Sequence, residues 1–229
     1  MMRRGAAAVL AACGLMSTAM ADTVGRIGFA LPSADWQELV RYERRLAYNG
    51  GESNDPLYVA VFVLPGDGRQ PRALLQLTST RGGHRGGRVM WVSERCPEPR
   101  EAYFADDQGT NRTTDRRDCL VVNARFAARA FFADDTAVTQ AAADKGLEWP
   151  KSAASIRSLV ATQTGELLRV HLMLARNLRE GTGRAPAATQ LWNVPAPLVA
   201  LGEQLREATR TAALSLSGEL KLPPFELEP

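Results

Sequence analysis

The chain has 229 residues, with 28 Lys or Arg residues against 25 Asp or Glu residues. Two of the basic residues lie within the first 21 residues, so a chain that begins at residue 22 has 26 basic residues against 25 acidic ones, a formal charge of +1. This near balance provides no global field for nucleic acid or an anionic membrane surface, and we expect no nucleic-acid partner. No segment after residue 21 has the length and apolar character that predict a membrane span.

The first 21 residues have the pattern of an export signal peptide. Arg3 and Arg4 precede an apolar run over residues 5–18, and Ala19-Met20-Ala21 is typical of a cleavage site. The apolar run is too short to stay in a bilayer as a permanent helix. The pattern therefore predicts a mature chain that begins at Asp22 and is periplasmic or secreted.

A lipid anchor is the competing interpretation of the same segment. Leu10-Ala11-Ala12-Cys13 matches a bacterial lipobox, in which Cys13 would carry the lipid. The apolar stretch before Cys13 is short for that purpose, and the new terminus would be apolar. We favour cleavage after Ala21 and keep a lipid-anchored envelope component as the alternative.

Two of the three cysteines remain after such cleavage, Cys96 and Cys119. An even pair in an exported chain predicts a disulfide bond. A metal site is the weaker interpretation, because the pair lacks C-x-x-C spacing and the only nearby histidine is His84. We expect no metal and no cofactor.

The first half of the chain contains several predicted strands. Residues 24–31 form a first apolar strand, and residues 36–48 fit a strand better than a helix because their apolar residues are aromatic and β-branched. Residues 57–64, 73–80 and 88–94 then predict an antiparallel meander of three strands.

The middle of the chain changes from strand to helix in this prediction. Residues 102–104 form a brief edge strand, residues 106–118 a polar loop, and residues 119–123 return to the sheet. The alanine-rich residues 124–132 and 136–145 predict two short helices. Asp134 or Asp135 is expected to cap the second of these helices and Gly146 to end it.

The last third predicts a hairpin and a final helix. Residues 156–162 and 166–175 form the hairpin, a helix runs from near Pro197 to near Gly218, and residues 222–229 are extended. The whole predicts one α+β domain over residues 22–229, an antiparallel sheet (the meander plus the later hairpin) covered by helices.

Four short sequences resemble those of uncharacterised exported proteins of Gram-negative bacteria. They are Thr80-Arg81-Gly82-Gly83, Trp91 followed by Cys96-Pro97, Asp118-Cys119-Leu120, and Pro223-Pro224-Phe225. This resemblance covers most of the mature chain and implies no activity. The order of elements also resembles that of PsbP-like α+β sandwiches, which is similarity of fold alone and implies no function.

The Arg/Gly loop, residues 81–88, is the strongest candidate for ligand binding. Its four glycines separate Arg81, His84, Arg85 and Arg88, so cationic side chains and backbone N–H groups are available to a phosphate or carboxylate. The alternative is a solvated hairpin loop whose glycines supply positive φ and whose arginines keep a sheet edge soluble.

Evidence for catalysis is thin in the sequence. His171 alternates with apolar residues and is expected to point off a strand face, toward solvent or a neighbour. The acidic pairs 106–107 and 134–135 suit a turn and a helix start, and no G-x-S-x-G motif is present. We expect a non-enzymatic binding or interaction module of the cell envelope, with an envelope protein or an anionic ligand as partner. An envelope hydrolase with a dispersed active site is the alternative.

Overall fold

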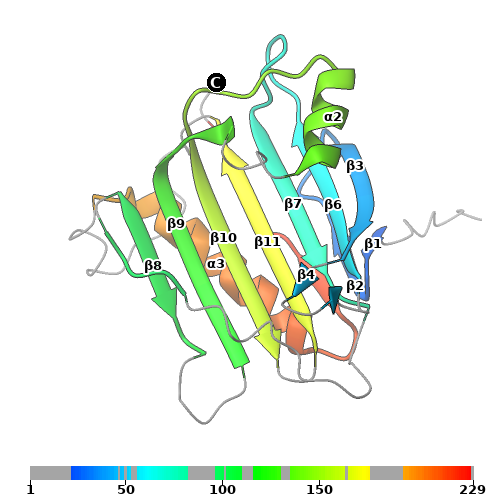
Figure 1. The fold of residues 1–229 in the computed structure, drawn as a ribbon. Helices are drawn as coiled ribbons and strands as arrows, with labels where there is room; N and C mark the ends of the chain where they lie inside the picture. Colours follow the sequence, from blue (N-terminus) through cyan, green and yellow to red (C-terminus); the bar gives the residue numbers. More distant parts are fainter. Residues whose placement is uncertain are drawn as a thin grey trace, which may run out of the picture.

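The computed structural model describes residues 22–45, 47–48, 51–52, 56–81, 96–100, 102–109, 116–129, 135–162, 165–175 and 193–227. Residues 1–21, with Cys13, and residues 82–95 of the loop region lie outside these ranges. The described residues form a mixed α+β fold built mainly of sheet (Figure 1). The large sheet has seven antiparallel strands in the order β3 (Gln37–Arg44), β6 (Leu57–Leu64), β7 (Ala73–Ser79), β11 (Leu167–Leu174), β10 (Ala153–Thr162), β9 (Arg116–Phe126) and β8 (Tyr103–Asp107).

The large sheet consists of two meanders joined side by side. Strands β3, β6 and β7 follow one another across one half, and β8 to β11 follow one another across the other half. The first two strands of the predicted meander pair as expected, as β6 and β7, and residues 88–94, its predicted third strand, lie outside the described residues. The other neighbour of β7 is β11, and the meander also includes β3, one strand earlier in the chain.

One face of the sheet packs against α3 (Ala196–Leu214) and a small three-stranded sheet. That small sheet contains β1 (Asp22–Val24), β2 (Ile27–Ala30) and β12 (Glu219–Lys221), so the first apolar segment forms two strands where one was predicted. Gly25 makes the turn between β1 and β2 with φ of +60°, and a Cβ there would lie 2.4 Å from the carbonyl oxygen of Thr80. Neither the positive φ nor the close approach suits a larger residue.

Helix α3 lies across β9, β10 and β11 on this face (Figure 1). Its Leu198, Leu201 and Leu205 are buried against sheet residues such as Leu120 and Ile156. A Cβ on Gly202 would lie 2.9 Å from a methyl group of Val122, so glycine lets the helix come close to β9. The apolar stripe that predicted this helix is therefore its contact with the sheet.

The other face of the sheet carries two separate apolar clusters. One lies where α2 (Thr136–Asp144) packs near β3 and contains Val61, Val138 and Met173. The second lies beside the cysteines and includes Val121 and Leu159. Polar and charged side chains occupy the sheet surface between the two clusters.

Several predicted elements are confirmed. Strand β6 has the predicted bounds, β10 and β11 form the predicted hairpin, and α2 begins after Asp135. Asp135 Oδ1 accepts a hydrogen bond from the backbone N–H of Val138 at 3.3 Å, and Gly146 has φ of +64° just past the helix. These are the N-cap and the C-terminal glycine that the sequence predicted.

Two predictions around β9 are wrong. The strand runs over Arg116–Phe126, so the helix predicted for residues 124–132 is not formed over residues 124–127; residues 128–129 are helical, and residues 130–132 lie outside the described ranges. The polar loop predicted for residues 106–118 is also shorter, since its first two residues end β8 and its last three begin β9.

In a separate pair of short strands, β4 (Ala47–Tyr48) pairs with β5 (Gly51–Glu52). None of the helices in the described residues is both long and apolar enough to cross a membrane.

Candidate functional site

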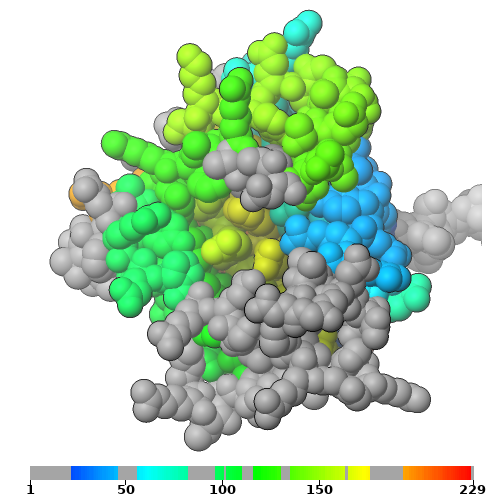
Figure 2. All heavy atoms as spheres, viewed as in Figure 1, coloured from blue at the N-terminus to red at the C-terminus, as the bar shows by residue number. Residues whose placement is uncertain are grey.

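A groove of about 390 Å³ lies on the sheet face opposite α3, between the two apolar clusters. Figure 2 shows this face hollowed at its centre, where atoms of β10 and β11 reach the surface between β9 and β3. We call it the sheet-face groove, and its lining residues come from six strands and the N-cap of α2. They are Arg44, Gln76, Tyr103, Val121, Asn123, Phe126, Asp135, Ser155, Arg157, Arg169 and His171.

Strand register explains why these side chains meet. Gln76 on β7 pairs with His171 on β11, which pairs with Arg157 on β10, which pairs with Val121 on β9. Directly opposed residues on neighbouring strands have Cβ atoms about 4.5–5.5 Å apart. One row of adjacent side chains therefore crosses the middle of the sheet.

Three arginines give the sheet-face groove a positive charge. Arg157 lies in the central row, and Arg169 lies two residues from His171 on β11, on the same face. Arg44 ends β3 at the opposite side, and its buried Nε has no hydrogen-bond partner among the described residues. Arg157 likewise forms no ion pair within the described residues.

The carboxylate in the sheet-face groove is already engaged. One oxygen of Asp135 caps α2, and the other accepts a hydrogen bond from the Tyr42 hydroxyl. Burial, and then this hydrogen bond, raise the pKa of Tyr42. Tyr42 therefore stays protonated as a donor to Asp135, and three guanidinium groups face one occupied carboxylate.

His171 lies among these arginines with its imidazole largely removed from water. Burial, and then the charges of Arg157 and Arg169, lower its pKa well below 6.5. The sequence placed His171 on a strand face toward solvent or a neighbour, and the structure places it toward neighbours in the groove. At neutral pH its ring is uncharged.

A β-bulge turns Phe126 into the sheet-face groove. Ser155 pairs with Asn123 but Ala153 pairs with Phe126, so β9 has one more residue than β10 between these pairs. On a regular strand, residues three apart point to opposite faces, and the bulge places Asn123 and Phe126 on one face. The Phe126 ring meets the His171 ring edge-on, with centroids 6.4 Å apart.

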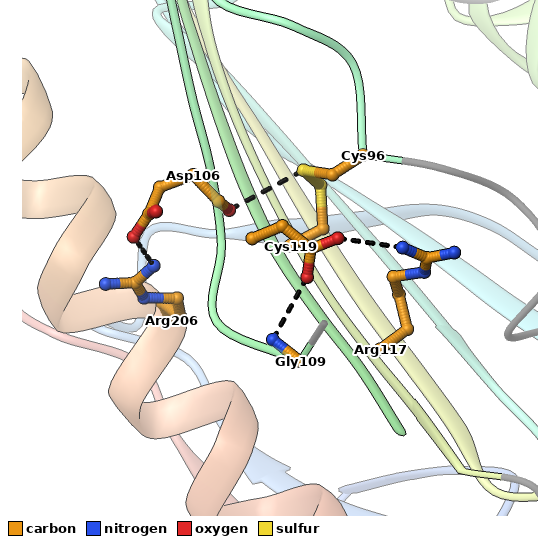
Figure 3. Close-up of a disulfide and its surroundings, with 7 residues drawn as sticks. Cys96, Asp106, Gly109, Arg117, Cys119 and Arg206 are labelled. Carbon is orange, nitrogen blue, oxygen red and sulfur yellow. Dashed lines mark hydrogen bonds and ion pairs between the residues drawn. A yellow bond between two sulfur atoms is a disulfide. The ribbon is translucent and has the colours of Figure 1, made fainter. Parts of the chain in front are cut away.

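The disulfide lies beside two of the arginines of the sheet-face groove. Cys96 and Cys119 lie at disulfide distance, with Cα atoms 5.6 Å apart, as the sequence predicted (Figure 3). A small cavity of about 30 Å³ beside the pair is also lined by Arg157 and Arg169. The disulfide therefore holds the segment from Cys96 onward against the wall that presents these two arginines.

Ion pairs attach this end of the sheet to its surroundings. Asp107 accepts hydrogen bonds from Arg117 at 2.7 Å and from the backbone N–H of Gly109 at 3.0 Å. Asp106 pairs at 2.6 Å with Arg206 on α3. The acidic pair interpreted as a turn feature therefore ties β8 to β9 and to α3.

The predicted Arg/Gly site is only partly within the described residues. Arg81 lies over the ring of Tyr58, with its guanidinium carbon 5.5 Å from the ring centroid. His84, Arg85 and Arg88 lie outside the described ranges. Of these four residues the structure describes Arg81 alone, and the sheet-face groove was not predicted.

Comparison with protein-family models, with curated proteins and with solved structures gave no match, so function has to be inferred from the chain's own residues.

The lowered pKa of His171 predicts a loss of stability in mild acid. Above pH 6.5 both folded and unfolded chains carry a neutral His171; below it the unfolded chain binds a proton that the folded chain does not. This difference lowers the unfolding free energy by at most about 1.4 kcal/mol per pH unit as pH falls below 6.5. Urea unfolding at pH 7.5 and 5.5 should show a smaller decline in His171→Gln than in the wild type. An equal decline in the unfolding free energy of both proteins would contradict the lowered pKa of His171.

Proposed function

We propose that this chain is an exported ligand-binding module of the bacterial cell envelope and that the sheet-face groove binds a small anion. The observation that carries the proposal is the gathering of Arg44, Arg157 and Arg169 around a groove whose carboxylate, Asp135, is engaged by Tyr42 and by α2. A guanidinium group donates charge-assisted hydrogen bonds to carboxylate or phosphate in a fork geometry.

The surroundings of the arginines support a ligand rather than a purely structural role. Structural arginines in this chain have acidic partners, as Arg206 has Asp106 and Arg210 has Asp118. Arg157 has no acidic partner among the described residues, although it lies within a groove of the size that small ligands occupy. An anion would supply the missing negative charge.

Export is part of the same proposal and rests on the sequence pattern of the first 21 residues. A disulfide pair is compatible with an oxidising compartment, which the periplasm provides. Mass spectrometry of the purified exported protein is expected to find Asp22 at the N-terminus. A lipid-bearing Cys13 would instead identify an anchored protein.

The test of the groove is anion binding by the mature protein. Titration with acetate and with inorganic phosphate at low ionic strength, followed by calorimetry or NMR, is expected to show saturable binding that salt weakens. Arg157→Gln should reduce the affinity by about tenfold or more, because a hydrogen bond to a charged group contributes about 1.5–3 kcal/mol.

Arg69→Gln is the matched control, since it makes the same change at an exposed residue outside the groove, where Arg69 pairs with Glu148. It should leave the affinity unchanged. Equal affinities in Arg157→Gln and the wild type, or no anion binding at all, would refute the proposal.

A further inference from the structure

The sheet-face groove contains a second set of polar groups that a bare anion does not use. Ser155 pairs with Asn123 across β10 and β9, and Asn123 pairs with Tyr103 across β9 and β8. All three line the groove. Hydroxyl and amide groups both donate and accept hydrogen bonds, whereas a carboxylate or a doubly charged phosphate only accepts. A ligand that also bears hydroxyl groups would match both kinds of partner.

The protein leaves capacity for hydrogen bonding in this set. Asn123 Oδ1 accepts from the backbone N–H of Arg125 at 3.0 Å, which leaves the amide N–H groups of Asn123 for a ligand. Ser155 forms no side-chain hydrogen bond with the described residues. The hydroxyl and amide thus form a pair of neighbouring sites next to Arg157, which lies two residues from Ser155 on β10.

Apolar surface completes this part of the groove. The bulge in β9 brings Phe126 to the face that carries Asn123, and Val121 lies beside Arg157. β-Bulges often re-aim a side chain next to a functional site. The aromatic ring of Phe126 provides a flat apolar surface of the kind that contacts the C–H face of a ring-shaped ligand.

The spacing of these groups fits one compact ligand. Strand residues rise about 3.3 Å each and neighbouring strands lie about 4.8 Å apart, so Arg157 and Ser155 are separated by about 7 Å along β10, and Asn123 lies about 5 Å from Ser155 on β9. A charged group and the hydroxyls of a single sugar ring span a similar distance. The groove volume of about 390 Å³ lies at the small-molecule end of the range for ligand pockets.

We propose that the ligand is an anionic sugar, bound with its carboxylate or phosphate at Arg157 and Arg169, its hydroxyls at Ser155 and Asn123, and its ring against Phe126. This inference rests on the proposed anion-binding function and adds the chemical class of the ligand. A free acidic sugar and the acidic unit of a glycan share this chemistry.

The test is calorimetry of the mature protein with D-glucuronate, glucose 6-phosphate, glucose, acetate, benzoate and inorganic phosphate. Glucuronate is expected to bind at least about tenfold more tightly than acetate, and glucose 6-phosphate likewise compared with phosphate. Ser155→Ala should reduce the affinity for the two acidic sugars by about threefold to tenfold and leave acetate and phosphate unchanged. Ser152→Ala, at an exposed serine outside the groove, is the control and should leave the affinities for the acidic sugars, acetate and phosphate unchanged.

Each outcome separates the two proposals. Equal affinities for glucuronate and acetate, or tighter binding of benzoate than of glucuronate, would overturn the sugar assignment while anion binding stands. Failure of every anion to bind would remove the proposed function as well. If an oligo-uronate binds more tightly than glucuronate, the sugar assignment holds and a glycan is the natural source of the ligand. If the two bind with equal affinity, the assignment holds and the free sugar is the source.

Discussion

Replacing Arg210 with methionine is expected to lower the free energy of unfolding by about 3–5 kcal/mol, because it leaves a buried carboxylate without its cation. Asp118 on β9 is fully buried, and its Oδ2 accepts a hydrogen bond from Arg210 Nε on α3 at 2.6 Å. This hydrogen bond is the largest cause that raises the pKa of Arg210. Urea unfolding at pH 7 measures the loss.

Two comparisons show whether the buried charge is the cause. Adding Asp118→Asn to Arg210→Met should recover part of the loss, because the remaining buried group is then neutral. Arg41→Met removes an exposed arginine that pairs with Asp22 and Glu38, and is expected to cost less than about 1 kcal/mol. A loss in Arg210→Met no larger than that in Arg41→Met would contradict the expectation.

The same ion pair explains why β9 was misassigned from the sequence. A strand that begins Arg-Arg-Asp and continues past Asn123 has polar residues at positions that the structure buries. Asp118 can be buried because it pairs with Arg210, which lies 92 residues away in the sequence. Arg117 pairs with Asp107 across the sheet. Local pattern carries no information about partners that distant, so the segment looks like a polar loop up to residue 118, a short strand over residues 119–123 and then a helix.

Strand β6 was predicted correctly for a complementary reason. Its residues are apolar on both faces, since Ala60 and Phe62 face α3 while Val59 and Val61 face the α2 side. A continuous apolar run needs no distant polar partner to be buried, and its bounds follow from the prolines and turn residues beside it. The sequence therefore predicts strands whose buried residues are all apolar better than strands that bury polar residues.

The sheet-face groove was missed because no single segment contains it. His171 and Gln76 alternate with apolar neighbours on their own strands, which is the pattern of an ordinary solvent-facing position, and Arg157 lies between Ile156 and Ser158 with no motif around it. They become one site only when the order β7-β11-β10-β9 is known. The bulge that adds Phe126 depends on the register between β9 and β10, and nothing in the sequence around Asn123 indicates it. The Arg/Gly loop attracted the prediction instead because its charged residues are neighbours in the sequence.

Removing the disulfide is expected to lower the free energy of unfolding by about 3 kcal/mol, because the cross-link restricts the unfolded chain. Cys96 and Cys119 are separated by 23 residues, and the bond joins the segment before β8 to β9. Urea unfolding of Cys96→Ala/Cys119→Ala, and of the wild type with and without a reducing thiol, measures this contribution. The double variant should unfold identically with and without thiol, which makes it the control for any other effect of the reductant.

The disulfide also contributes to the shape of the sheet-face groove, which extends the prediction to binding. Cys119 is packed with Val121 and Leu159, and the cavity beside the pair is lined by Arg157 and Arg169. Reduction at a urea-free, folding condition should therefore weaken anion binding in the wild type and leave the double variant unaffected. A wild type whose unfolding and anion affinity are both indifferent to thiol would show that the cysteines are not bonded in the native protein, because two free thiols cannot restrict the chain or hold the wall of the groove.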